Sequence, residues 1–75
     1  MALKDNLRRL RATRVMTQGE LAEKAGVSKT TVARAEIGQL VPHPKNIRKL
    51  AEALGVEPSA LIGPDEMLRA GKEAA

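Results

Sequence analysis

Residues 17–36, TQGELAEKAGVSKTTVARAE, carry two helix-start signals separated by one glycine, and this stretch constrains the fold more than any other. Thr17 and Glu20, three residues apart, form a capping box, and Ser28 is a second N-cap. Gly26 stands where a helix ends in the left-handed conformation. The pattern predicts two short helices, residues 18–25 and 29–36, joined by a turn that contains Gly26. This arrangement is a helix-turn-helix unit.

Apolar spacing predicts the remaining helices. Leu3, Leu7 and Leu10 lie on one face of a helix over about residues 4–14. Ile47, Leu50, Ala51 and Leu54 mark another helix, which begins near Pro44 and is closed by Gly55. Pro58 opens a short fifth helix that includes Leu61 and Ile62. We therefore expect an all-α, compact five-helix bundle with a helix-turn-helix domain over residues 1–63 and a C-terminal tail over 64–75, which can form a short helix.

Composition narrows the functional classes. The 75 residues include no cysteine, which excludes disulfides, and no aromatic residue, which counts against stacking of single-stranded bases. Because no run of about 18 apolar residues occurs, no membrane partner is expected, and a bacterial or phage cytoplasm is the expected location. Residues 1–34 contain eight Lys and Arg against three acidic residues, whereas residues 35–75 contain five against six. The basic first half indicates a polyanionic partner.

The sequence contains no defensible catalytic or cofactor motif. The segment GVSKTT lacks the spacing of a phosphate-binding loop. His43 is the only histidine and has no metal-ligand or catalytic companion at useful spacing, so it is interpreted as a loop residue. We expect no enzymatic activity, no cofactor and no metal.

Linked motifs over residues 7–62 resemble the Cro/repressor-type, xenobiotic-response-element-like helix-turn-helix family. These motifs are LRRLRATR, TQGELAEKAGVS, TVARAEIG and the segment from Pro42 to Val56 with the pattern P-x-x-x-x-I-x-K-L-A-E-A-L-G-V. The resemblance implies a lambda-repressor-like fold in which the second helix of the unit, residues 29–36, enters the major groove of DNA. It also implies specific roles for individual residues.

Base-contacting positions of the family fall on Lys29, Thr30 and Arg34. Positions that contact phosphate or support the reading helix fall on six residues: Gln18, Ser28, Thr31, Gln39, Lys45 and Asn46. Of these, Ser28 and Thr31 match positions that lie near phosphates or thymine methyl groups. A partly buried ion pair of the family falls on Arg11 and Glu36. We expect Arg8 and Arg9 to lie on a solvated face.

Two positions depart from the family pattern. Ala35 stands where the family prefers Leu or Ile, so the packing there is expected to be looser or to be filled by a neighbour. Ile37 stands where a polar or basic residue is usual. Either one phosphate contact is lost at this position, or Ile37 completes the core that Ala35 leaves short.

The expected function is that of a sequence-specific regulator of transcription, a repressor, which binds double-stranded DNA. A C2 homodimer on a palindromic site is expected, with contacts in residues 56–68 because Leu61, Ile62, Met67 and Leu68 form a late apolar set. Two alternatives stay open: an antitoxin that represses its own operon and neutralises a toxin, and a protein-interaction module that uses this fold without DNA. The operator and any effector or toxin partner are unknown from sequence.

Overall fold

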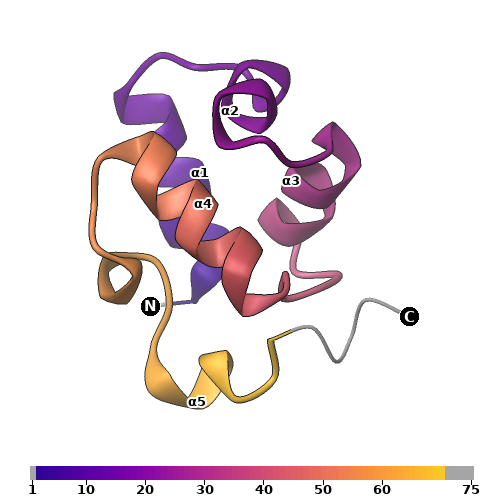
Figure 1. Cartoon of the computed structure of the whole chain (residues 1–75), viewed down its shortest axis with the longest axis vertical. Coiled ribbons are helices and arrows are strands. Elements are labelled where there is room, and N and C mark those ends of the chain that lie inside the picture. Colours follow the sequence, from indigo (N-terminus) through magenta and orange to yellow (C-terminus); the bar gives the residue numbers. More distant parts are fainter. Residues whose placement is uncertain (1, 71–75) are drawn as a thin grey trace.

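The computed structural model describes residues 2–70, and the regular secondary structure in this range is helical (Figure 1). The five α-helices are α1 (Leu3–Thr13), α2 (Gln18–Ala25), α3 (Lys29–Glu36), α4 (Pro44–Leu54) and α5 (Pro64–Met67), with a 3-10 turn, η1 (Pro58–Ala60), before α5. No strand occurs within residues 2–70, so the all-α prediction is confirmed. None of the helices in this range is long and apolar enough to cross a membrane.

Side-chain caps define the helix-turn-helix formed by α2 and α3. The backbone N–H of Glu20 donates to Thr17 Oγ1 at 3.0 Å, and the N–H of Thr17 donates to Glu20 Oε1 at 2.8 Å, which completes the capping box. Gly26 ends α2 with a φ of 75°. Ser28 Oγ then accepts the N–H of Thr31 at 3.1 Å and starts α3. Both helices begin and end where the sequence predicts.

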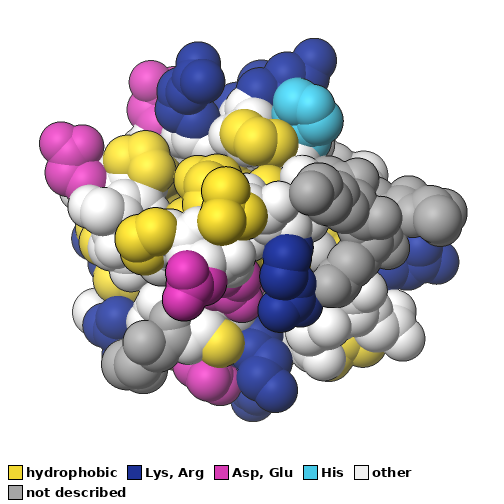
Figure 2. All heavy atoms as spheres, turned by 90° about the horizontal axis from the view of Figure 1, so that it is seen from below, with side chains coloured by type: hydrophobic (Ala, Val, Ile, Leu, Met, Phe, Trp, Pro, Cys, Tyr) yellow, Lys and Arg dark blue, Asp and Glu magenta, His cyan; other side chains and the backbone are white. Residues whose placement is uncertain are grey.

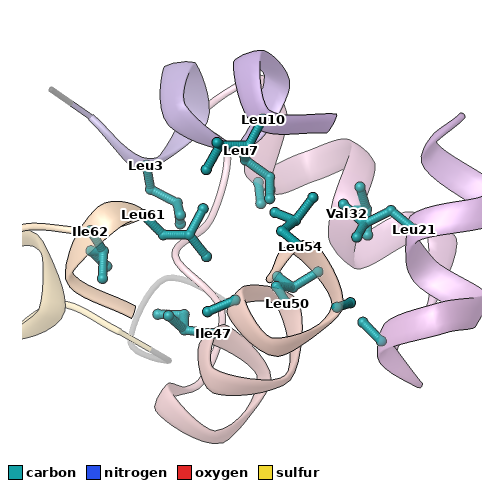
Figure 3. Packing of buried hydrophobic residues seen from close by; sticks show 14 of the residues in the cluster. Leu3, Leu7, Leu10, Leu21, Val32, Ile47, Leu50, Leu54, Leu61 and Ile62 are labelled. Carbon is teal, nitrogen blue, oxygen red and sulfur yellow. The ribbon is translucent and has the colours of Figure 1, made fainter. Parts of the chain in front are cut away.

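The core lies between α1, α4 and the helix-turn-helix, as Figure 3 shows. Leu7 of α1, Leu50 of α4 and Val32 of α3 are completely buried. Burial of one such aliphatic side chain stabilises a fold by about 1.5–3 kcal/mol. Because α3 contributes Val32 and Ala35 to this core, its opposite side is left at the surface.

The expected fifth helix at Pro58 is wrong in extent. Pro58 opens only the 3-10 turn η1. Gly63 and Pro64 separate this turn from α5, so no continuous helix forms. Pro64 has no backbone N–H with which to continue a helix from the preceding turn. Leu61 and Ile62 follow η1 and are buried in the core, and Leu61 is completely inaccessible, so it is not available for the homodimer contact that the sequence suggested.

Helix α5 is joined to the beginning of α1. The N–H of Leu3 donates to Glu66 Oε1 at 2.8 Å, and Met67 packs against the core. Asn6 Nδ2 donates to the carbonyl of Leu61 at 2.8 Å, which ties α1 to the segment before α5. The division between a domain of residues 1–63 and a tail stays a prediction, and residues 71–75 of that tail lie outside the described range.

The turn between α1 and α2 contains a strained residue that the sequence did not reveal. Val15 has a φ of 53° and an exposed fraction of 89%. A β-branched residue rarely adopts this left-handed conformation, because its side chain crowds the following carbonyl. The exposed side chain recovers little burial energy, so Val15 weakens this turn.

Candidate nucleic-acid interface

One face of α3 is exposed and polar. Lys29, Thr30 and Arg34 are all exposed, and Thr30 and Arg34 are four residues apart, so they lie one above the other along the helix. The aliphatic part of the Lys29 side chain lies against α2. Its Cδ is 3.9 Å from the place that a Cβ atom would occupy if Gly19 had a side chain. All three candidate base-contacting residues are therefore accessible, and Thr30 and Arg34 lie on the same side of the helix.

The C-terminal end of α3 is fixed by a hydrogen-bonded cluster. The Glu36 carboxylate is buried and accepts Arg11 Nε at 2.6 Å and Arg11 Nη2 at 2.9 Å. Gln18 Nε2 donates to the same carboxylate at 3.0 Å, and Arg11 Nη1 donates to the carbonyl of Met16 at 2.7 Å. This cluster joins α1, the following turn, α2 and α3, so it sets the orientation of the exposed face.

The hydrogen bonds to Glu36 also affect the titration of Arg11. They raise the pKa of Arg11 above its ordinary value, whereas burial lowers it and the charge of Glu36 raises it further. A raised folded-state pKa stabilises the fold at all pH values below the ordinary pKa of arginine, and this stability is lost only as the pH rises through the folded value. The guanidinium is therefore charged over the whole working range of a protein.

The first turn of α3 is held by side chains that the resemblance places near phosphates or thymine methyl groups. Ser28 Oγ and Thr31 Oγ1 are 2.8 Å apart, and Thr31 is half-buried. Thr31 thus has a structural partner, while Ser28 stays exposed at the N-terminus of the helix. The positive end of the helix dipole and the basic residue Lys29 both favour an anion near this turn.

A second polar region lies where the chain passes from α3 to α4. The N–H of Gln39 donates to the carbonyl of Arg34 at 2.9 Å, and both Gln39 and Lys45 are exposed. Asn46 is half-buried, and its N–H donates to the carbonyl of His43 at 2.8 Å. Whether Gln39, Lys45 and Asn46 contact phosphate stays a prediction.

His43 is the N-cap of α4, a role that the sequence analysis missed. Its Nδ1 accepts the N–H of Lys45 at 3.4 Å, and Pro44 follows at the first helical position. A polar residue directly before a proline at a helix start was the signal that could have revealed it. Within residues 2–70, no His, Cys, Asp and Glu side chains form a group of three that could hold a metal ion.

Lys4 is a second residue that sequence reasoning did not place. Gly38 has a φ of 79°, and a Cβ built on it would lie 3.2 Å from Lys4 Cδ and 3.9 Å from Lys4 Nζ. The side chain of Lys4, which begins on α1, therefore crosses the turn directly after α3. The contact joins residues far apart in the sequence, so no local pattern could have indicated it.

The structure shows where the two residues that depart from the family pattern, Ala35 and Ile37, are placed. Ile37 is 63% exposed, so the prediction that it completes the core is wrong. It follows the last residue of α3 at a helical position that turns outward, while Ala35 is buried. A pocket of about 170 Å³ that opens to the surface, bordered by Ala35, Leu40 and Val41 among others, lies beside the small side chain.

Figure 2 shows a hydrophobic patch on the lower face of the molecule, flanked by acidic and basic side chains. A shallow apolar depression of about 250 Å³ on the described surface is formed by η1, the start of α5 and the segment between them. Its lining residues are Pro58, Ser59, Ile62, Gly63, Pro64 and Met67. Leu68, directly after α5, is 73% exposed. The apolar surface available in residues 56–68 is therefore made by these residues rather than by Leu61.

Two curated relatives resemble the chain over most of its length. The chain is 30% identical over 69 residues to the immunity repressor protein of Bacillus phage phi105, covering 92% of this chain and 48% of that protein. It is 42% identical over 59 residues to the HTH-type transcriptional repressor RghR of Bacillus subtilis (strain 168), covering 77% of this chain and 44% of the relative. The chain therefore spans about half the length of the relatives it matches.

Solved structures support the same fold. The restriction-modification controller protein C.AhdI from Aeromonas hydrophila matches with a TM-score of 0.77 and 37% identity, over 80% of this chain and 91% of that one. The P22 c2 repressor protein, solved in complex with a synthetic operator, matches with a TM-score of 0.78 at 24% identity, over 83% of this chain and 94% of that one. At that identity the likeness concerns the fold alone. The family model described as helix-turn-helix matches residues 7–61, and the chain belongs to this helix-turn-helix family, of the Cro/C1 type.

Proposed function

We propose that the chain is the DNA-binding unit of a transcriptional regulator, a repressor, which recognises a specific sequence in double-stranded DNA. The observation that carries the proposal is the two-sided character of α3. Lys29, Thr30 and Arg34 are exposed on it, while Glu36 is buried and fixed to Arg11 and Gln18. A helix held in this way fits the major groove of B-DNA, where each base pair has its own pattern of donors and acceptors.

Affinity and sequence choice are assigned to different groups. Lys29 and Arg34 contact base edges, with Thr30 between them. The residues proposed to contact phosphate, or to support those that do, are Gln18, Ser28, Thr31, Gln39, Lys45 and Asn46. Release of counterions from the phosphates supplies most of the affinity, and α3 supplies the preference for sequence.

Names of relatives support the regulatory part of the proposal. One relative is an immunity repressor of a phage, and another is a transcriptional repressor of a bacterium. We accordingly propose a cytoplasmic regulator without enzymatic activity or cofactor.

The size of the domain and its apolar patch support a homodimer. A single small module buries only about 600–1,000 Å² on DNA, which is little for tight specific binding. We propose that the lower face, with Met67 and Leu68, joins two copies about a two-fold axis. Two copies of α3 would then lie about 34 Å apart, one turn of B-DNA.

Selection from a random duplex pool tests the function. The pool should yield one enriched sequence with two-fold symmetry. Arg34→Ala should weaken binding to that sequence by about 1–3 kcal/mol and relax one base preference in each half-site. Lack of any enriched duplex, with specific binding only to a protein, would refute DNA recognition and favour the protein-interaction alternative.

A further inference from the structure

An apolar side chain interrupts the polar surface at the end of α3. Ile37 is 63% exposed, although it lies beside the residues proposed to read DNA. Val15 and Leu68 are also large, apolar and exposed, but one lies in the turn before α2 and the other directly after α5. Ile37 is thus the exposed large apolar residue that adjoins α3 in the described part of the chain.

Backbone geometry places Ile37 on the outer face of α3. Ile37 is the C-cap residue directly after Glu36. Its φ of −104° and ψ of 5° depart from helical values, so the helix ends here, but the preceding helical residues still place it at the next position along the helix. Ile37 follows Ala33 by four positions, Arg34 by three and Thr30 by seven. Residues at these spacings share one side of a helix. Ile37 and the half-buried Ala33 therefore form an apolar strip within the face that carries Thr30 and Arg34.

The major groove of DNA contains one kind of apolar group that this strip could contact. Most base edges there present hydrogen-bond donors or acceptors, and the apolar feature is the C5-methyl group of a pyrimidine. An isoleucine side chain neither donates nor accepts, so covering a polar edge with it would leave that edge without a partner. Phosphate contacts by this side chain are excluded for the same reason.

We propose that Ile37, together with Ala33, contacts the C5-methyl group of a pyrimidine and is a specificity-determining residue of the site. The inference rests on the proposed DNA-binding function and adds a reader that acts by apolar contact. The methyl group belongs either to thymine or to 5-methylcytosine. Recognition of the second would make binding depend on methylation of the site.

The test is a mutant cycle on the selected duplex. Each thymine is replaced in turn by deoxyuridine, which removes only the methyl group, and each cytosine by 5-methylcytosine, which adds one. Both duplex series are titrated with the wild-type protein, with Ile37→Ala and with Val15→Ala. The last variant truncates an exposed apolar side chain in a different turn. Because Ile37 is exposed, Ile37→Ala should retain the wild-type thermal transition, which circular dichroism verifies.

Removal of one methyl group from an apolar contact should weaken wild-type binding about fourfold. We expect this loss at one thymine in each half-site, and we expect Val15→Ala to show the same loss. Ile37→Ala should bind the thymine and deoxyuridine duplexes about equally. If the group is instead 5-methylcytosine, methylation of one cytosine should strengthen wild-type binding about fourfold and leave Ile37→Ala unaffected.

Two results have different meanings. If a duplex is selected but wild-type protein and Ile37→Ala respond equally to every methyl change, DNA recognition holds and the role of Ile37 is refuted. If no duplex is selected, the proposed function fails and this inference fails with it.

Discussion

The buried cluster around Glu36 leads to a quantitative prediction about stability. Arg11→Met removes two hydrogen bonds to a carboxylate whose side chain is only 3% exposed, and it leaves this charge without its cation. Breaking one half of a buried ion pair costs about 3–5 kcal/mol. Because the Arg11 side chain is itself 21% exposed, the lower end of this range, about 3 kcal/mol, applies.

That loss is large for a chain of 75 residues, whose free energy of unfolding is expected to be about 4–11 kcal/mol. Replacing both partners by apolar residues, in Arg11→Met/Glu36→Leu, removes the unpaired charge and should recover at least about 1 kcal/mol relative to Arg11→Met. Recovery is incomplete, because the carbonyl of Met16 and the amide of Gln18 lose the partners they have in the wild type.

The assay is urea unfolding followed by far-UV circular dichroism. Intrinsic fluorescence cannot be used, because the chain has no tryptophan or tyrosine. Arg8→Met is the matched control, since it removes an exposed arginine from the same helix and should change stability by less than about 0.5 kcal/mol. The claim that the ion pair is buried and costly to break would be refuted by either of two results. One is a loss of unfolding free energy below about 1 kcal/mol for Arg11→Met, and the other is a double variant less stable than either single variant.

Further predictions concern the strained turn, the phosphate contacts and the lower face. Val15→Gly should raise the free energy of unfolding by about 1 kcal/mol, because glycine adopts a positive φ without steric cost; an equal gain from Val15→Ala would show that strain is not the cause. Lys45→Ala should weaken specific and non-specific DNA about equally and reduce the slope of log K against log salt by about one unit, whereas Arg8→Ala should leave the slope unchanged. Leu68→Glu should leave the thermal transition intact but abolish the preference for a duplex with two half-sites over one, as measured by sedimentation; an unchanged preference would place the dimer contact elsewhere.

Sequence predicted the fold wherever local signals act. The capping box at Thr17, the glycine at residue 26 and the N-cap at Ser28 depend on atoms within four positions of each other, and all three appear as expected. The ion pair of Arg11 with Glu36 was implied by family resemblance and is present. The extent of the segment after Pro58 was not predicted correctly, because spacing alone does not distinguish one 3-10 turn from a longer helix.

The candidate site was predicted in outline only. The exposed positions of Lys29 and Arg34 follow from helical periodicity once α3 is known. The position of Lys4 over Gly38 depends on how α1 packs against the turn after α3, which no local pattern encodes. The exposure of Ile37 was undecided from sequence because its residue type favours the core, whereas its helical position faces outward.

The hydrogen bond from the Leu3 amide to Glu66 joins the two ends of the described chain, because the two residues are separated by 63 positions. Closing so long a loop costs more entropy than closing the turn between α2 and α3, so this contact should form late during folding. The Leu3 amide proton would then exchange with solvent whenever α5 detaches, even while α2 and α3 stay folded. Hydrogen exchange at this single amide thus reports the opening of the opposite end of the chain.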